Sequence, residues 1–382
     1  MVTSAGWVIG AASATALAAG AAAGSPELMI IGLVGVAALL QALLWMLLRP
    51  ELIAVRDIEP PRVPEAEPAR ALLLVRNQGR RRSPPILATE RVGTSSVSVP
   101  VPSLAARETH HSTYPLPTER RGIYDVGPFT FGHTDPLRLL SASRSYTSRT
   151  QLVVHPHVHA VAPLPTGTNR DMEGPTSASS PRGGIAFHSI RPYERGDSLR
   201  DVHWKKSAQT GQLLVCHKVV PDEPSLMVVL DTCAASFEGD AFEDAVRVAV
   251  SLAVAGTSGG YPLQLRTTGG DVVVCEGRLG EADVLDLLAG VRTSADDPGL
   301  SSLAAISPGR ATVSLGVVTG YPDPAVLSVV SQVRPSYLMA SLIQVGAVRH
   351  SSFQLPQLQG VLSVSCMDSA DFARQWNALV AA

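Results

Sequence analysis

The sequence predicts a chain of three parts: two N-terminal transmembrane helices, a small β-rich domain of the sandwich type, and an α/β domain built on an open sheet. Two uncharged stretches come first, then short β-type runs broken by glycine and proline, and then short apolar runs that alternate with helical stretches. The 382 residues suffice for two or three domains. The expected parts are a helical hairpin over 1–50, the β-rich domain over 51–162, a linker with a charged motif over 163–221, and the α/β domain over 222–382.

Composition narrows the possible function classes. Hydrophobic residues make up 45% of the chain and charged residues 17%, so the chain as a whole is neither disordered nor fibrous. The formal net charge of −2 argues against a strongly basic nucleic-acid binder, and we expect no nucleic-acid partner. The four cysteines lie far apart without a C-x-x-C pair, which argues against a zinc ribbon or a disulfide scaffold.

The two apolar stretches before residue 50 predict membrane helices. Residues 28–48 carry no charge and only Gln41 is polar; at 1.5 Å per residue this stretch spans about 32 Å, enough for the hydrocarbon core. Residues 6–24 are also uncharged, and the Gly-Ser-Pro-Glu sequence at 24–27 predicts a tight turn between two helices. A signal peptide is the competing interpretation, but it needs a basic N-terminal region, and residues 1–4 contain no basic side chain.

Basic residues near the helix ends predict the orientation of the chain. The turn at 24–27 has none, whereas Arg49, Arg56 and Arg62 follow the second stretch closely. We therefore expect a multi-pass protein of the cell membrane, with both termini and the soluble domains in the cytoplasm. If the first stretch does not span the membrane, the body remains inside only when the N-terminus lies outside.

The two soluble domains differ in their patterns. Prolines at 60, 61, 64 and 68 predict an extended connection, and residues 163–184, dense in Pro, Gly, Ser and Thr, predict a boundary loop. Between them, the expected strands are 71–76, 96–101, 122–131 and 151–158. After residue 225, the expected strands are 226–230, 263–267, 312–318 and 337–345, and the expected helices are 241–255, 281–288, 324–332 and 369–380. Uniformly apolar strands that alternate with helices predict a parallel sheet covered on both faces.

The most distinctive stretch is the charged turn, residues 191–208. Nine side chains from Arg191 to Lys206 are Arg, Lys, Glu, Asp or His, and Gly196-Asp197 is a turn signal. Val202 and Trp204 have the spacing of one strand face, and Asp197 is a plausible carboxylate partner for Arg191 or Arg200.

Three interpretations of the charged turn compete. In the first, it is a structural network that buries Trp204. In the second, it is a surface that docks a partner through arginine and aromatic anchors. In the third, it is a catalytic or nucleotide site. The phosphate-loop pattern G-x-x-x-x-G-K-[ST] is absent from the sequence, and two adjacent lysines make a weak case for nucleic acid.

The same residues carry a family resemblance. The run that contains them is Arg191-x-Tyr193-x-x-Gly196-Asp197-x-x-Arg200-x-x-x-Trp204-x-x-Ser207-Ala208, followed by Gly211-x-Leu213-x-Val215. With Arg121-Gly122-x-Tyr124-x-x-Gly127-Pro128 and Asp135-Pro136-Leu137 upstream, this run resembles the signature of the domain of unknown function 58 family of bacterial membrane proteins. The resemblance implies a domain similar to von Willebrand factor type A, a MoxR-type AAA+ ATPase as partner, often a transglutaminase-like membrane protein nearby, and no established enzymatic activity.

The type A resemblance also implies where a metal would bind. Such domains hold a divalent cation with D-x-S-x-S after the first strand, because hard cations prefer oxygen ligands. The matching stretch is Asp231-Thr232-Cys233-Ala234-Ala235, so a thiol at Cys233 and a methyl at Ala235 replace the two hydroxyls. Asp323 is a candidate ligand from a later loop. We expect the site to be degenerate, and we expect no metal or other cofactor.

For the remaining candidate residues we favour structural roles over metal binding or catalysis. His155, His157 and His159 share one side if their segment is a strand, but collinear side chains do not converge on a tetrahedral zinc, so a polar strand face is expected. Cys233 at a strand end needs a nearby base or a helix N-terminus to become a reactive thiolate.

The leading functional hypothesis is a membrane-anchored, non-enzymatic adaptor that works with a MoxR-type ATPase in assembly related to the cell envelope. One alternative is a hydrolase or transferase that uses the charged turn as its active site. The other is a metal-dependent adhesion module, which the loss of oxygen donors at Cys233 and Ala235 disfavours.

Overall fold

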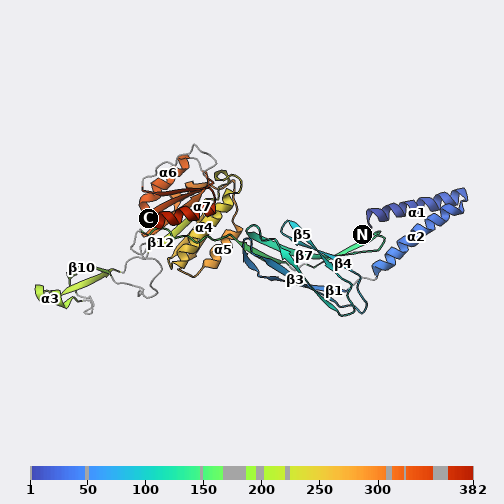
Figure 1. The fold of residues 1–382 in the computed structure, drawn as a ribbon, viewed down its shortest axis with the longest axis horizontal. Coiled ribbons are helices and arrows are strands. Elements are labelled where there is room, and N and C mark those ends of the chain that lie inside the picture. Colours follow the sequence, from blue (N-terminus) through green and yellow to red (C-terminus); the bar gives the residue numbers. More distant parts are fainter. Residues whose placement is uncertain are drawn as a thin grey trace. The chain divides into compact units, whose positions relative to one another are not determined.

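The computed structural model describes residues 2–47, 51–146, 149–166, 186–194, 202–219, 224–306, 312–321, 324–346 and 360–381. The chain divides into two compact units, Met1–Pro156 and His157–Ala382 (Figure 1). The first unit contains the N-terminal helices and the β-rich domain, and the second contains the α/β domain.

Two antiparallel helices open the chain, α1 (Ser4–Ala23) and α2 (Pro26–Leu47). Both are long and apolar enough to cross a membrane, as the sequence predicts. Gly24 ends α1 in the left-handed conformation that favours glycine, with φ 63°. The helices approach closely at Gly32, where an added Cβ would lie 2.5 Å from Cγ of Leu17.

The β-rich domain consists of two sheets. Its strands are β1 (Leu52–Glu59), β2 (Arg62–Pro64), β3 (Ala69–Asn77), β4 (Ile86–Val92), β5 (Ser95–Val101), β6 (Thr109–Leu116), β7 (Gly122–Thr134), β8 (Ser141–Tyr146) and β9 (Thr150–His155). One sheet has the order β1-β3-β6, and the other has the order β2-β9-β7-β4-β5, with β8 paired to β7. The second sheet is mixed, because β2 and β9 run parallel.

Alternation along the strands explains how the two sheets share one core. Buried and exposed positions alternate along β3 and β4, as expected for strands with one face packed and one solvated. Val75 and Ala88, from different sheets, belong to the same hydrophobic cluster. An ion pair between Arg56 on β1 and Glu90 on β4 is buried inside this sandwich, which the sequence analysis does not foresee.

The second unit is built on a six-stranded sheet of order β14-β13-β12-β15-β16-β17. The strands are β12 (Ser225–Leu230), β13 (Leu263–Thr267), β14 (Val272–Cys275), β15 (Val313–Thr319), β16 (Met339–Val345) and β17 (Leu362–Cys366). Neighbouring strands are parallel except β14, which pairs antiparallel with β13 at the edge. The expected open α/β sheet is therefore present, with β14 and β17 as additions.

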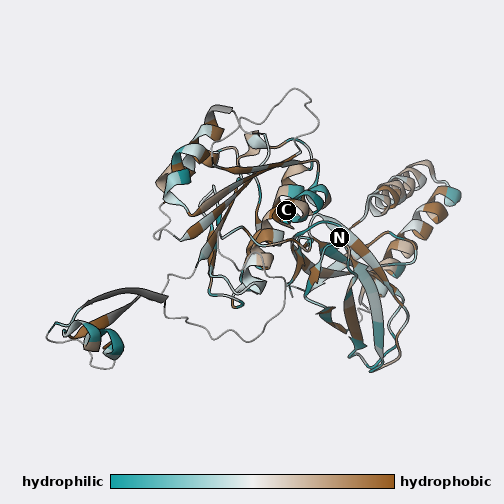
Figure 2. Ribbon diagram, turned by 60° about the vertical axis from the view of Figure 1, so that its left-hand side comes forward, coloured by the Kyte–Doolittle hydropathy of each residue, from teal (hydrophilic) through white to brown (hydrophobic). Residues whose placement is uncertain are grey.

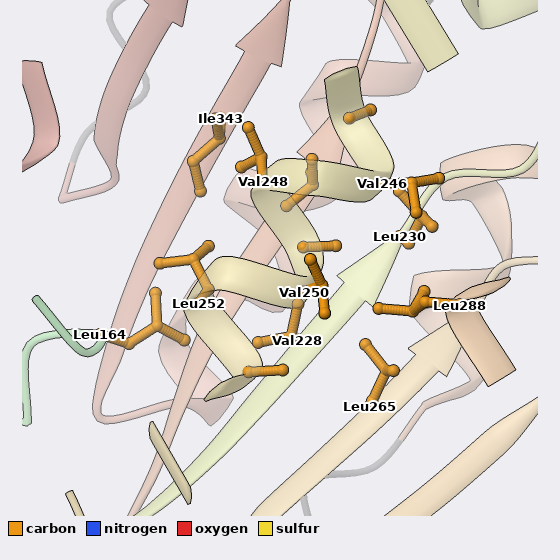
Figure 3. Close-up of a cluster of buried hydrophobic side chains, with 14 of the residues drawn as sticks. Leu164, Val228, Leu230, Val246, Val248, Val250, Leu252, Leu265, Leu288 and Ile343 are labelled. Atoms are coloured by element: carbon orange, nitrogen blue, oxygen red, sulfur yellow. The ribbon is translucent and has the colours of Figure 1, made fainter. Parts of the chain in front are cut away.

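Helices cover both faces of this sheet. They are α4 (Ala241–Ser258), α5 (Glu281–Gly290), η4 (Gly299–Ala305), α6 (Pro324–Val333), η5 (Arg334–Ser336) and α7 (Ser369–Ala381). Val228 and Leu230 belong to one hydrophobic cluster with residues of α4, α5 and α7, and Figure 3 shows its members on α4 and α5. Met227 and Val229 belong to a second cluster with residues of η4 and α6. Because helices cover both faces of the sheet, its central strands β12 and β15 are largely apolar and are buried along almost their whole length (Figure 2).

Residues 157–166 are packed on the α/β domain. Leu164 belongs to its core, over Gly316 of β15, where an added Cβ would meet Leu164 at 2.9 Å. The indole of Trp376 donates to the Ala162 carbonyl at 2.8 Å, and the side chain of Asn377 bonds the backbone of the same segment. The second unit thus begins at His157, whereas the sequence analysis divides this segment between the β-rich domain and the linker.

Candidate functional site

The charged turn lies within a hairpin unit, residues 186–219. Strand β10 (Ala186–Pro192) pairs antiparallel with β11 (Leu214–Val219), and Arg191 lies opposite Val215. A short helix, α3 (Trp204–Thr210), precedes β11. Gly196, Asp197 and Arg200 lie outside the described residues, as does the side chain of Arg191, so the ion pair expected among them stays a prediction.

Trp204 does not lie on a strand face, so that expectation is wrong. It begins α3 and is 63% exposed, which also contradicts the interpretation in which the turn buries it. The reason is local: the imidazole Nδ1 of His203 accepts the Lys206 N–H at the helix start, and Gly211, with φ 72°, ends the helix. Val202 instead bridges to Val215 and is buried.

Ser207 and Tyr193 hold the hairpin unit together. The Ser207 hydroxyl accepts the Leu214 N–H at 2.9 Å and is buried, which ties α3 to the start of β11. The Tyr193 N–H donates to the Leu213 carbonyl at 2.8 Å and continues the pairing of the strands. Ser207 is therefore a structural residue here, and among the described side chains of Tyr193, Trp204 and Ser207, Trp204 is the exposed one.

A second candidate region lies where the parallel strands of the α/β sheet end. Asp231 follows β12 and is fully buried. Its Oδ1 accepts the Cys233 N–H at 2.9 Å, and its Oδ2 accepts the hydroxyl of Thr319, the last residue of β15, at 2.7 Å. Both oxygens of this carboxylate are thus occupied by neighbours in the protein.

A second carboxylate, Asp297, lies beside the first. Its Oδ2 accepts hydrogen bonds from the hydroxyls of Thr232 and Thr268, the latter at 2.9 Å. Its Oδ1 accepts the Gly299 N–H at 2.7 Å. We call Asp231, Thr232, Thr268, Asp297 and Thr319 the strand-end network.

The strand-end network does not fit the cation site that the type A resemblance implies. Cys233 and Ala235 stand at the two hydroxyl positions, and Ala235 lies inside a short 3-10 helix, η3 (Ala234–Ser236). All four carboxylate oxygens of Asp231 and Asp297 already accept protein hydrogen bonds. Among the residues that the structure describes, no cluster of three or more His, Cys, Asp or Glu side chains is placed to hold a metal, and Asp323 lies outside them.

Asp231 can be identified from the sequence as a strand-end residue, whereas the roles of Thr232, Thr268, Asp297 and Thr319 were not predicted. Two of these threonines were detectable in principle: Thr268 comes directly after the strand expected at 263–267, and Thr319 comes directly after the strand expected at 312–318. The carboxyl ends of parallel strands meet at one edge of a sheet, so residues at those positions converge. Asp297 lies in a loop, where no pattern marks it.

The polar strand face expected of His155, His157 and His159 does not form, whereas the reactivity of Cys233 stays a prediction. Strand β9 ends at His155, one residue before Pro156, so the three histidines do not share a strand face. The rings of His157 and His159 instead meet edge to face, with centroids 4.7 Å apart. At two other cysteines, Cys275 and Cys366, burial raises the pKa of the thiol and so disfavours a thiolate.

Comparisons with known proteins leave the family open. No family model and no curated protein matches the chain. Among solved structures, a CARDB domain from Pyrococcus furiosus is 15% identical, with a TM-score of 0.22, and covers 28% of this chain and 93% of its own. The C-terminal domain of wzt is 14% identical, with a TM-score of 0.23, over 29% of this chain and 81% of its own. A GH2 beta-galacturonidase from Eisenbergiella tayi is 10% identical, with a TM-score of 0.18, and the match covers 77% of this chain and 46% of its own. These scores are too low to support an argument about fold or function.

Proposed function

We propose that this chain is a membrane-anchored, non-enzymatic adaptor of the domain of unknown function 58 family. Its α1–α2 hairpin anchors it in the cell membrane as a multi-pass protein with the soluble body in the cytoplasm. Its α/β domain is of the von Willebrand factor type A kind, and its hairpin unit docks a MoxR-type AAA+ ATPase that acts in cell-envelope assembly. A transglutaminase-like membrane protein is a further expected partner.

The observation that carries the proposal is the exposure of Trp204. A tryptophan in a solvent-exposed position at the start of a short helix contributes little to folding, whereas tryptophan and arginine are the residues that most often anchor protein interfaces. Lys205 and Lys206 beside it are also exposed. An exposed aromatic side chain with adjacent positive charges suits a partner surface that is apolar at its centre and acidic at its rim.

The enzyme alternative finds less support in the hairpin unit. A serine nucleophile needs its hydroxyl within reach of a base, but the Ser207 hydroxyl is engaged by the backbone of Leu214. The nearby His203 uses Nδ1 to accept the Lys206 N–H. The adhesion alternative is weakened by the strand-end network, whose carboxylates bond to the protein rather than offering free oxygens.

Quantitative co-purification from native membranes tests the proposal. The full chain should recover a MoxR-type ATPase, and Trp204→Ala should reduce the recovered amount at least about tenfold, the loss expected of an interface anchor worth more than about 1.4 kcal/mol. Leu279→Ala is the matched control, because Leu279 is an exposed apolar residue of the α/β domain outside the hairpin unit. Equal recovery by all three proteins, or no ATPase in any of them, would contradict the proposal.

A further inference from the structure

The β-rich domain follows α2 in the chain, and the end of the domain nearest that helix carries several arginines. Strand β1 starts at Leu52, five residues after the last residue of α2. Because an extended chain spans at most about 3.6 Å per residue, Glu51 lies within about 14 Å of Leu47. Whatever the angle between helix and domain, this end of the domain stays close to the end of the helix.

Two loops are held at this end by a buried asparagine. Asn77 ends β3, and its side-chain amide donates to the carbonyls of Arg81, Leu104 and Ala105 at 2.9–3.1 Å. The loop after β3 is also fixed to the chain that leaves α2, because the Gln78 N–H donates to the Glu51 carbonyl at 2.7 Å.

The turn between β7 and β8 belongs to the same end. Gly132 on β7 pairs with Leu87 at the start of β4, which follows the first of these loops. This turn also bonds the start of α1, since the Thr3 N–H donates to the Leu139 carbonyl at 3.0 Å and its hydroxyl donates to the Arg138 carbonyl at 2.7 Å. Both outer ends of the helical hairpin are therefore attached to one end of the domain.

Five arginines on these three segments have exposed side chains, and we call them the arginine rim: Arg80, Arg81, Arg82, Arg107 and Arg138. Within the described part of the chain, the ion pairs are made by other arginines. The exposed carboxylates on the neighbouring segments are those of Glu51 and Glu108, and the latter accepts the Ala105 N–H. The five positive charges thus exceed the two negative ones.

We propose that the arginine rim binds the anionic phosphate headgroups of the membrane that holds the helices, and so fixes the β-rich domain against the lipid surface. This inference rests on the proposed membrane anchoring. Guanidinium groups pair with phosphate oxygens through two parallel hydrogen bonds, and a basic residue near an anionic surface contributes about 1 kcal/mol, or about fivefold in affinity. The covalent tether keeps the rim close to the headgroups, so no high intrinsic affinity is needed.

Arginine-specific labelling tests the inference in the full chain. The protein is placed in lipid nanodiscs, made either of phosphatidylcholine alone or with phosphatidylglycerol added, and phenylglyoxal modification of each arginine is followed by peptide mass spectrometry. Rim arginines should react at least about fivefold more slowly in the anionic discs, and high salt should remove the difference. Arg70 and Arg91 provide controls in the same molecule, because they are exposed at the opposite ends of β3 and β4 and should react equally in both discs.

Paired variants decide whether the rim acts as a unit. Arg80→Gln with Arg81→Gln should return Arg107 and Arg138 toward the labelling rate seen in neutral discs, whereas Arg70→Gln with Arg91→Gln should leave them protected. Equal labelling of the rim in neutral and anionic discs would overturn the inference and leave the membrane anchoring intact. A chain that enters neither kind of disc would overturn the anchoring and, with it, the inference.

Discussion

The strand-end network and the hairpin unit make opposite use of their polar and apolar side chains. In the network, the carboxylates of Asp231 and Asp297 are turned inward, and protein donors occupy all four of their oxygens. In the hairpin unit, the buried polar residue Ser207 is satisfied by the backbone, while the largest apolar side chain, Trp204, faces solvent.

This difference indicates which side chains stabilise the fold and which are available to bind a partner. Buried polar groups that satisfy one another stabilise a fold but offer little to a ligand, because a ligand would have to break bonds already made. An exposed aromatic side chain adds little to the fold and gains free energy only when a partner covers it. Substitutions that separate folding from binding therefore test the comparison directly.

The largest effect is expected at the buried ion pair of the β-rich domain, the extreme case of inward-turned charge. Glu90→Ala leaves the guanidinium of Arg56 buried without its carboxylate, and should lower the free energy of unfolding of this domain by about 3–5 kcal/mol. Hydrogen exchange of the β4 and β7 amides in the full chain measures the loss. The double variant Arg56→Met with Glu90→Leu is the control and should recover most of it; a single variant as stable as the wild type would contradict the prediction.

The next effect is expected in the strand-end network. Asp231→Ala removes the acceptor for the Thr319 hydroxyl and the Cys233 N–H, and should destabilise the α/β domain by about 2–4 kcal/mol. Thr319→Val removes one donor and should cost about 1 kcal/mol. Exchange of the β12 and β15 amides reports both values. If Asp231→Ala leaves these amides as protected as before, the network does not stabilise the domain.

A much smaller effect on stability is expected at Trp204. Because its side chain is exposed, Trp204→Ala should change the free energy of unfolding by no more than about 0.5 kcal/mol. Exchange of the β10 and β11 amides reports the change, with Ser207→Ala as a comparison that should open the hairpin unit more. A loss at Trp204→Ala larger than that at Ser207→Ala would make the tryptophan a structural residue.

The smallest effect is expected from the pH dependence of the α/β domain. Burial, followed by the charges of His157 and Arg247, lowers the pKa of His159 from 6.5, against the opposing pull of Asp244 and Asp368. A lowered histidine pKa gives stability that is present above pH 6.5 and is lost as the pH falls through the folded-state value.

His159→Gln tests this dependence. After division by the intrinsic exchange rate at each pH, the protection of the α4 and α7 amides should fall more in the wild type than in the variant between pH 7 and pH 5. The difference should be small, because the imidazole is only partly buried. An identical loss of protection in the two proteins would remove His159 as the cause.

The elements of the second unit were the most predictable from sequence. The strand expected at 263–267 matches β13 residue for residue, because its buried positions alternate with the half-buried Gln264 and Arg266, the period of two that is typical of a strand. The two N-terminal apolar helices are equally clear, since their length and lack of charge, which would suit a bilayer, can be recognised in the sequence. The helix at Trp204 was missed because it has only 7 residues, too few to show a helical period in the sequence, and because its N-cap is a histidine.

The strand-end network was only partly predictable for a different reason. Asp231 directly follows an apolar strand, so its position at the end of that strand can be predicted from the sequence. Asp297 and Thr268 reach it only through the folding of two separate loops onto the sheet edge. The pairing of Arg56 with Glu90 likewise depends on two strands from different sheets, which no local pattern brings together.

Titration of the full chain with a purified MoxR-type ATPase tests the central claim most directly. The account predicts that Trp204→Ala weakens the dissociation constant by about 30-fold, the loss expected of an interface anchor worth about 2 kcal/mol, while Thr319→Val and Leu279→Ala bind as the wild type does. Undiminished binding by Trp204→Ala together with weakened binding by Thr319→Val would place the docking surface at the strand ends and contradict the account.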